Sequence, residues 1–184
     1  MMYQGGEKFS PPFFFLETNM SEKNSITILG LGNILLQDEG FGVHFIRWFE
    51  KNYQLPEGVK IVEGGTLGYK LLDTVCSCDN LLVIDVIKAN DEPGSIYRFT
   101  KEEIDEQELQ PTSAHEVSFQ DVLCKAELIE ELPDVIFLCV VPYEYKDMGL
   151  ELTTLMRKKI PEVEKLLLQE LSVHGINPMK LNNA

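Results

Sequence analysis

The chain has 184 residues, of which 44% are hydrophobic and 25% charged, a balance typical of one globular domain with its own core. Its formal net charge of -14 argues against a surface that binds nucleic acid or anionic membranes, because both need basic patches. The acidity would suit a basic partner, although solubility alone explains it. No apolar run approaches the roughly 20 residues that span a bilayer. The four cysteines lack zinc or redox spacing, so we expect a cytoplasmic protein.

The first 24 residues precede the first strand pattern. Their apolar stretch, 13–16, is short, follows two prolines and has no basic region before it, which is unlike a secretory signal. We therefore predict a weakly ordered extension over residues 1–24, a single α/β domain over residues 25–175 and a polar tail over residues 176–184.

Apolar runs and helical periodicity predict an alternating series of elements. In chain order they are a strand at 26–31, a helix from 40 to about 53, a turn at 56–58, a strand at 59–62, a helix at 67–75 capped by Thr66, and a strand at 81–87. A turn at 91–94, an edge strand at 95–99, a polar irregular segment at 100–115, a helix at 117–129, a strand at 135–141, a loop at 143–150 and a helix at 153–172 follow. Pro161 should kink or split that last helix.

This alternation of strands and helices predicts the fold class. We expect an α/β protein, a three-layer αβα sandwich with a mostly parallel, twisted sheet of about five strands. One edge strand is expected to be antiparallel.

The turn Gly30-Leu-Gly32-Asn33 stands between the first strand and the first helix, where a nucleotide-binding protein holds phosphate. It lacks the third glycine of the dinucleotide fingerprint, and Asp38 and Glu39 stand at the helix start. Two carboxylates there repel phosphate and attract a cation. A nucleotide-binding enzyme remains an alternative at this point.

Three residues are expected at the carboxyl edge of the sheet, where α/β proteins bind their ligands: Glu39, Asp85 and His115. Each has a simpler explanation. Asp85 interrupts an apolar strand, but it can accept backbone hydrogen bonds; Glu39 can stabilise a helix dipole; His115 can lie on the surface. Two carboxylates and one imidazole together suit a divalent transition metal, with positions left open for water or substrate.

Several segments, in order, resemble a known family, the endopeptidases that mature the large subunit of nickel–iron hydrogenases. The resemblance covers nearly all of residues 26–172. The segments that carry it are Gly30-Leu-Gly-Asn33, Asp38-Glu39-Gly-Phe-Gly42-Val43, Glu63-Gly64-Gly65-Thr66, Leu82-Val-Ile-Asp85, Pro93-Gly94, Ser113-Ala-His115-Glu, Val141-Pro142 and Gly149-Leu-Glu-Leu152. Two features depart from the family pattern: the N-terminal extension, and Glu63, where aspartate is commoner.

This resemblance implies a concrete activity, the removal of a C-terminal extension from a hydrogenase large-subunit precursor after nickel insertion. It implies that Glu39, Asp85 and His115 contact the metal. The metal would be nickel supplied by the precursor, and zinc or cadmium could occupy the same place. A monomer or weak homo-oligomer is expected.

The resemblance also suggests roles for the remaining motif residues. Asp38 would either support the metal contacts from a neighbouring position or act as a catalytic acid, and Asp38 or Glu39 would serve as the general base. Gly64, Gly65 and Thr66 would help to hold the extended substrate segment. The alternative function is a non-catalytic assembly factor that senses nickel in the immature subunit without cutting it.

Overall fold

The computed structural model describes residues 25–106, 118–129 and 132–181. The strands are β1 (Ile26–Leu31), β2 (Tyr53–Gln54), β3 (Val59–Gly65), β4 (Asn80–Val86), β5 (Ile96–Thr100), β6 (Asp134–Val140) and β7 (Met179–Lys180). The helices are α1 (Phe41–Asn52), α2 (Leu72–Cys76), α3 (Lys101–Glu106), α4 (Phe119–Glu127), α5 (Thr154–Arg157) and α6 (Ile160–Val173), with short 3₁₀ turns η1 (Gln37–Gly40) and η2 (Gly68–Leu71).

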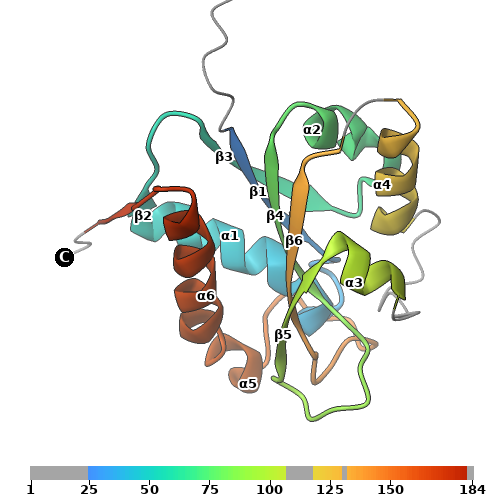
Figure 1. The fold of residues 1–184 in the computed structure, drawn as a ribbon. Coiled ribbons are helices and arrows are strands. Elements are labelled where there is room, and N and C mark those ends of the chain that lie inside the picture. Colours follow the sequence, from blue (N-terminus) through green and yellow to red (C-terminus); the bar gives the residue numbers. More distant parts are fainter. Residues whose placement is uncertain (1–24, 107–117, 130–131, 182–184) are drawn as a thin grey trace, which may run out of the picture.

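Five strands form the main sheet in the order β3-β1-β4-β6-β5. The first four are parallel, and β5 runs antiparallel to β6 at the edge. Figure 1 shows α1 and α6 on one face of this sheet and α2, α3 and α4 on the other. The predicted three-layer α/β fold with one antiparallel edge strand is therefore confirmed.

The core consists of two apolar clusters, one on each face of the sheet. Successive residues of a strand point to opposite faces, so Ile28 packs with the α1 and α6 side while its neighbour Leu29 packs with α2 and α4. On the first face Phe41, Phe45 and Phe49 of α1 are fully buried and form a stacked series. Because both faces are covered, the ligand-accessible part of the sheet is its carboxyl edge.

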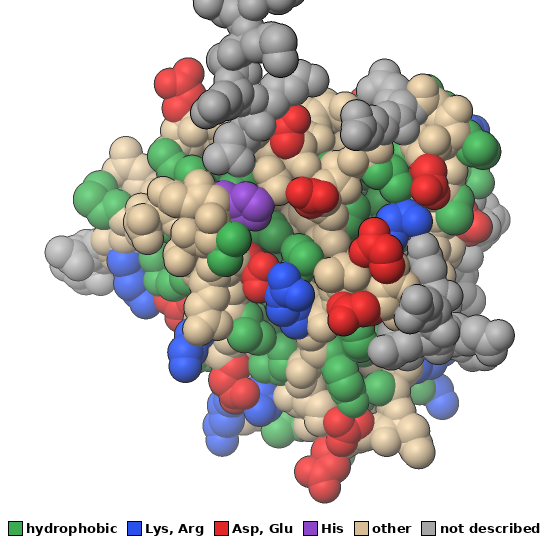
Figure 2. Space-filling view, in the orientation of Figure 1, with side chains coloured by type: hydrophobic (Ala, Val, Ile, Leu, Met, Phe, Trp, Pro, Cys, Tyr) green, Lys and Arg blue, Asp and Glu red, His purple; other side chains and the backbone are tan. Residues whose placement is uncertain are grey.

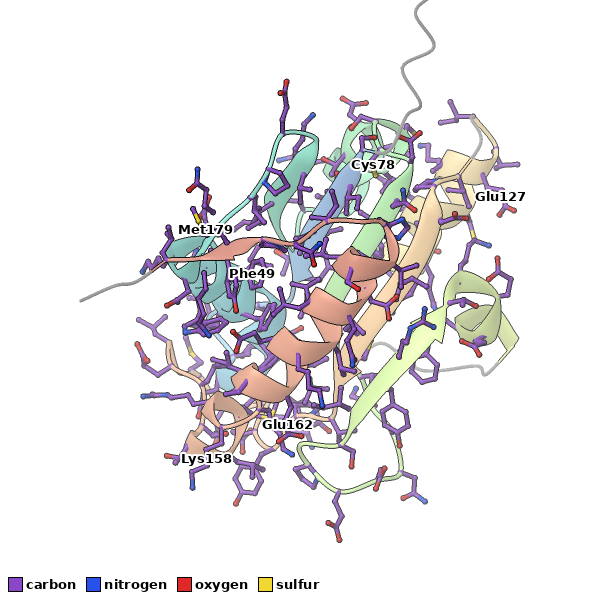
Figure 3. The ribbon with its side chains drawn as sticks, turned by 60° about the vertical axis from the view of Figure 1, so that its left-hand side comes forward. Phe49, Cys78, Glu127, Lys158, Glu162 and Met179 are labelled. Carbon is purple, nitrogen blue, oxygen red and sulfur yellow. The ribbon has the colours of Figure 1, made fainter. Side chains whose placement is uncertain are left out.

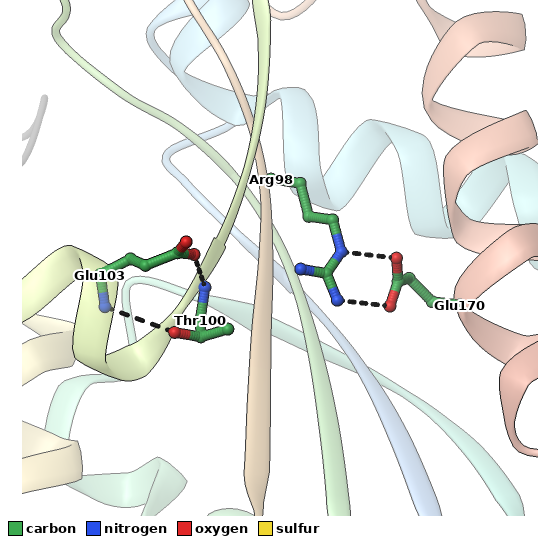
Figure 4. A network of polar contacts seen from close by, with 4 residues as sticks. All are labelled: Arg98, Thr100, Glu103 and Glu170. Carbon is green, nitrogen blue, oxygen red and sulfur yellow. Dashed lines mark hydrogen bonds and ion pairs between the residues drawn. The ribbon is translucent and has the colours of Figure 1, made fainter.

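Polar capping explains a helix that the sequence analysis described as irregular. Residues 101–106 form α3, which starts with a reciprocal pair of hydrogen bonds drawn in Figure 4. The backbone N–H of Thr100 donates to Glu103 Oε2 (2.8 Å), and the backbone N–H of Glu103 donates to Thr100 Oγ1 (3.3 Å). This is a capping box, whose Thr-x-x-Glu pattern is visible in the sequence.

Two further predictions about helices have different outcomes. Thr66 does not cap a helix: it lies in a turn after Gly65, whose φ angle is positive, and η2 begins after Leu67 without a side-chain cap. Pro161 does divide the last helical segment, since α5 ends at Arg157 and Pro161 lies in the first turn of α6.

A second, two-stranded sheet, formed by β2 and β7, was not predicted from the sequence. Within it, Lys180 Nζ binds Glu164 of α6 (2.8 Å) and lies over the Tyr53 ring. Figure 3 shows Met179 at the outer margin of the molecule and Phe49 on the neighbouring α1.

The predicted extension over residues 1–24 lies outside the described residues, and the predicted domain limits stay predictions. Within the described part of the chain, no helix is long and apolar enough to cross a membrane.

Candidate functional site

Close glycine contacts fix the junction between β1 and α1. Gly32 has a φ of 114°, and a Cβ atom there would lie 1.9 Å from the carbonyl oxygen of Glu39. A Cβ atom on Gly42 would lie 2.1 Å from the carbonyl oxygen of Ile84. These glycines therefore let the start of α1 pack directly on β1 and β4, which brings the η1 turn to the carboxyl edge of the sheet.

Glu39 lies in that turn and is buried, with 1% of its surface exposed. Its Oε2 accepts a hydrogen bond from the backbone N–H of Asn33 in the glycine turn. Asn33 Oδ1 in turn accepts from the N–H of Leu35 (3.0 Å). The place where a nucleotide-binding turn would hold phosphate is thus taken by a carboxylate of the chain itself.

Asp85 lies near the carboxyl end of β4 and faces the same region. Its pKa is raised to about 7: burial is the largest cause, the hydrogen bond from the N–H of Val86 (2.7 Å) acts in the opposite direction, and the negative charge of Glu39 adds to the increase. Glu39 and Asp85 are thus close enough to repel each other. A carboxyl group with so strongly shifted a pKa beside another carboxylate is typical of a functional site.

Asp38 is fully buried but points toward another part of the chain. Its Oδ1 accepts from the N–H of Thr153 (2.7 Å), and its Oδ2 accepts from the N–H of Glu144 and the hydroxyl of Thr153, both at 2.9 Å. The Asp38 N–H donates to the carbonyl of Glu144 (3.0 Å). Asp38 therefore joins η1 to the loop that follows β6 and to the start of α5.

Cys139 is the cross-strand neighbour of Asp85 on β6 and is buried. Burial and, secondarily, the nearby Asp85 charge raise the pKa of its thiol well above the ordinary value. A protonated thiol is a poor nucleophile, so the chemistry of this edge does not resemble that of a cysteine peptidase.

The remaining predicted site residues divide into two groups. Gly64, Gly65 and Thr66 end β3 at the same edge, and the carbonyl of Gly65 accepts from the N–H of Gly32 (3.1 Å). His115 lies outside the described residues, and among the residues that are described no group of three or more His, Cys, Asp or Glu side chains is arranged to hold a metal. The proposed ligand set of Glu39, Asp85 and His115 accordingly stays a prediction.

Glu63, the departure from the family pattern, lies on β3 and forms an ion pair with Arg47 of α1. Both its oxygens receive hydrogen bonds from Arg47 (2.7 and 2.6 Å), which lower the pKa of the Glu63 carboxyl.

The residues that support the site, Asn33 and Thr153, were not predicted from the sequence. For Asn33 a signal existed, since asparagine commonly accepts a bond from the N–H two residues on; for Thr153, 115 residues from Asp38, none did.

Comparison with known proteins identifies relatives of the whole α/β region. The model of a hydrogenase maturation protease family matches residues 43–170. The hydrogenase expression/formation protein HupD of Bradyrhizobium diazoefficiens is 34% identical over 158 residues, which cover 85% of this chain and 82% of that protein. The hydrogenase 2 maturation protease of Escherichia coli is 33% identical over 155 residues, covering 82% and 94%.

A solved structure shows the same architecture. The hydrogenase maturating endopeptidase HybD from Escherichia coli superposes with a TM-score of 0.80 at 28% sequence identity. The match covers 87% of this chain and 99% of that one. The likeness thus extends over nearly the complete length of the solved protein.

Proposed function

Because the chain belongs to the hydrogenase maturation protease family, we propose that it removes a C-terminal extension from the large-subunit precursor of a nickel–iron hydrogenase after nickel insertion. It is an endopeptidase by family membership, which favours cutting over the non-catalytic assembly role. The observation that carries the proposal is the pairing of buried Glu39 with Asp85 at the carboxyl edge of the sheet.

The nickel of the precursor is part of the substrate in this proposal. Glu39 and Asp85 suit a divalent cation because positive charge between them would offset the burial that chiefly raises the pKa of Asp85, and would relieve the smaller repulsion from Glu39. His115 is the proposed third contact, and zinc or cadmium would be accepted by the same donors. A bound cation would polarise the scissile carbonyl and lower the pKa of a nearby water.

We assign different tasks to the two neighbouring carboxylates. Glu39, held by the N–H of Asn33 and adjacent to Asp85, accepts a proton from the attacking water. The water oxygen bonds to the scissile carbonyl carbon, the carbon–nitrogen bond breaks, and the proton passes to the leaving amine. Asp38 already accepts three hydrogen bonds, so it positions η1 instead of moving a proton.

The end of β3 is proposed to hold the substrate segment. The Gly64–Thr66 turn is tied to the glycine turn by the Gly32–Gly65 hydrogen bond, which keeps it beside Glu39. Because β3 stands at one end of the strand order, an extended peptide can pair with its outer edge.

Mass spectrometry of the precursor tests this function. Purified protein incubated with nickel-loaded precursor should shorten the precursor at its C-terminus, and Asp85→Asn and His115→Ala should abolish that mass change. Asp134→Asn, the same substitution at the opposite end of a neighbouring strand, is the control and should process normally. Binding of the precursor with no mass change would support the assembly-factor alternative, and full activity of both site variants would reject the site.

A further inference from the structure

Exposed apolar side chains gather on two loops at the carboxyl edge of the sheet. Leu35, Met148 and Leu150 keep 50%, 82% and 64% of their surface exposed. Leu35 belongs to the turn that follows β1, and the other two belong to the loop that follows β6. Figure 2 shows hydrophobic side chains interspersed with Asp, Glu, Lys and Arg side chains over the face in view.

Backbone hydrogen bonds hold these two loops side by side. The N–H of Gly149 donates to the carbonyl of Leu35 and the N–H of Gln37 donates to the carbonyl of Gly149, both at 2.9 Å. Leu36 and Gly149 form a parallel bridge. Leu35 and the two residues that flank Gly149 therefore lie on directly paired loops, and we call these three exposed apolar residues the loop patch.

Buried Asp38 fastens the loop patch to the candidate site. It holds Glu144 and Thr153, the residues on either side of the second loop, and it is the chain neighbour of Glu39. Asn33, two residues before Leu35, donates to Glu39 itself. Asp38 and the paired loops hold Leu35, Met148 and Leu150 in positions where water contacts them. The exposure of these apolar side chains to water costs free energy unless another surface covers them.

We propose that the loop patch is the docking surface for the folded body of the hydrogenase large-subunit precursor, next to the segment that is cut. This inference rests on the proposed function. The occupant follows from continuity: a protein substrate whose chain reaches Glu39 and Asp85 must cover the surface joined to Glu39 through Asn33 and Asp38. The apolar centre of such an interface gives affinity, whereas Glu39 and Asp85 act on the scissile bond.

Steady-state kinetics with nickel-loaded precursor test the proposal. A triple variant, Leu35→Ser with Met148→Ser and Leu150→Ser, should raise KM at least about tenfold and change kcat less than about twofold, because it removes binding and leaves the reacting groups in place. The matched control replaces Leu128, Ile129 and Val173 with serine; these are exposed apolar residues at the ends of α4 and α6, and their loss should leave KM unchanged.

The outcomes separate this inference from the proposed function. If the wild-type protein does not shorten the precursor, the proposed function fails. If the wild type cuts and the triple variant cuts with an unaltered KM while the thermal melting of both is the same, only the docking inference is overturned. Light scattering adds one further result: a wild-type dimer that the triple variant loses, with KM unaltered, would make the loop patch a contact between two copies and reject a precursor as its occupant.

Discussion

Asp85 couples the candidate site to the stability of the fold. Its pKa of about 7 in the folded protein, against 3.8 for an ordinary aspartate, means that the folded state binds more protons than the unfolded state between these pH values. The free energy of unfolding that Asp85 contributes therefore falls as the pH rises from about 4 to 7. The cause is burial, with repulsion from Glu39 added.

Asp85→Asn removes this charge and should stabilise the metal-free protein at pH 8, by at most about 4 kcal/mol for a shift of about three pH units. The gain should shrink toward zero near pH 4, where the wild-type carboxyl is protonated. Urea denaturation at both pH values in the presence of a chelator measures the difference. If the free energy of unfolding of Asp85→Asn is lower than that of the wild type by the same amount at both pH values, the charge of Asp85 is not buried.

His44 on α1 should contribute a pH dependence of opposite sign. Its Nε2 is buried and has no hydrogen-bond partner among the described residues, and burial, followed by the charge of Arg47, lowers its pKa below 6.5. The unfolded state then binds more protons just below pH 6.5, so this histidine's contribution is lost as the pH falls. In thermal melts, we expect the melting temperature of His44→Leu to fall less than that of the wild type as the pH is lowered from 6.5 to 5. An identical loss in both proteins would contradict a buried neutral imidazole.

Sequence reasoning identified Asp85 because a carboxylate in an apolar strand is costly and therefore conspicuous. It grouped Asp38 with Glu39 because the two are adjacent in the chain. In the structure their side chains have different partners, since Asp38 accepts bonds from residues 106 and 115 positions away. Partners at that separation depend on tertiary folding and leave no local pattern, so the sequence allowed Asp38 either a supporting or a catalytic role and could not identify its partners.

At the level of the elements, the buried strands were predictable and the short helices less so. Continuous apolar runs specify β1 and β4 almost to the residue, because a strand covered on both faces tolerates little else. α3 is six residues long and mostly polar, so hydrophobic periodicity could not reveal it. Its stability depends on its cap and on the contact of buried Ile104 with the second core cluster.

Thr100→Ala should lower the free energy of unfolding by about 1 kcal/mol, because it removes one half of the capping box of α3. Equilibrium urea denaturation is the measurement. Thr154→Ala is the control, since Thr154 is an exposed first residue of α5 and Thr153 is the cap there. Should the two alanine variants unfold alike, the capping box would have no energetic role. Neither substitution changes a partner of the ion pair between Arg98 of β5 and Glu170 of α6 (2.7 Å), which Figure 4 also shows.

For the molecule as a whole, the glycine junction decides whether α1, the sheet and the candidate site keep their relative positions. Gly42→Ala would place a methyl group 2.1 Å from the Ile84 carbonyl and 2.5 Å from the Leu31 carbonyl, both of which are backbone atoms. We expect a loss of at least about 2 kcal/mol, the usual cost of overpacking. Gly58→Ala is the comparison: it meets no atom within 4 Å but has a φ of 89°, so it should cost only about 1 kcal/mol of backbone strain. If thermal melts show that Gly58→Ala lowers the melting temperature more than Gly42→Ala does, the close packing at this junction is contradicted.

The pairing of β7 with β2 makes one amide a reporter of hydrogen exchange beside α1. The N–H of Leu181 donates to the carbonyl of Asn52, the last residue of α1, over 2.7 Å. An exposed amide without a partner exchanges rapidly with solvent deuterium, whereas this one is retained only while β7 stays paired beside α1. The deuterium uptake of this amide, measured by mass spectrometry of the peptide that contains Leu181, therefore reports local opening at the end of α1 that is farther from Glu39.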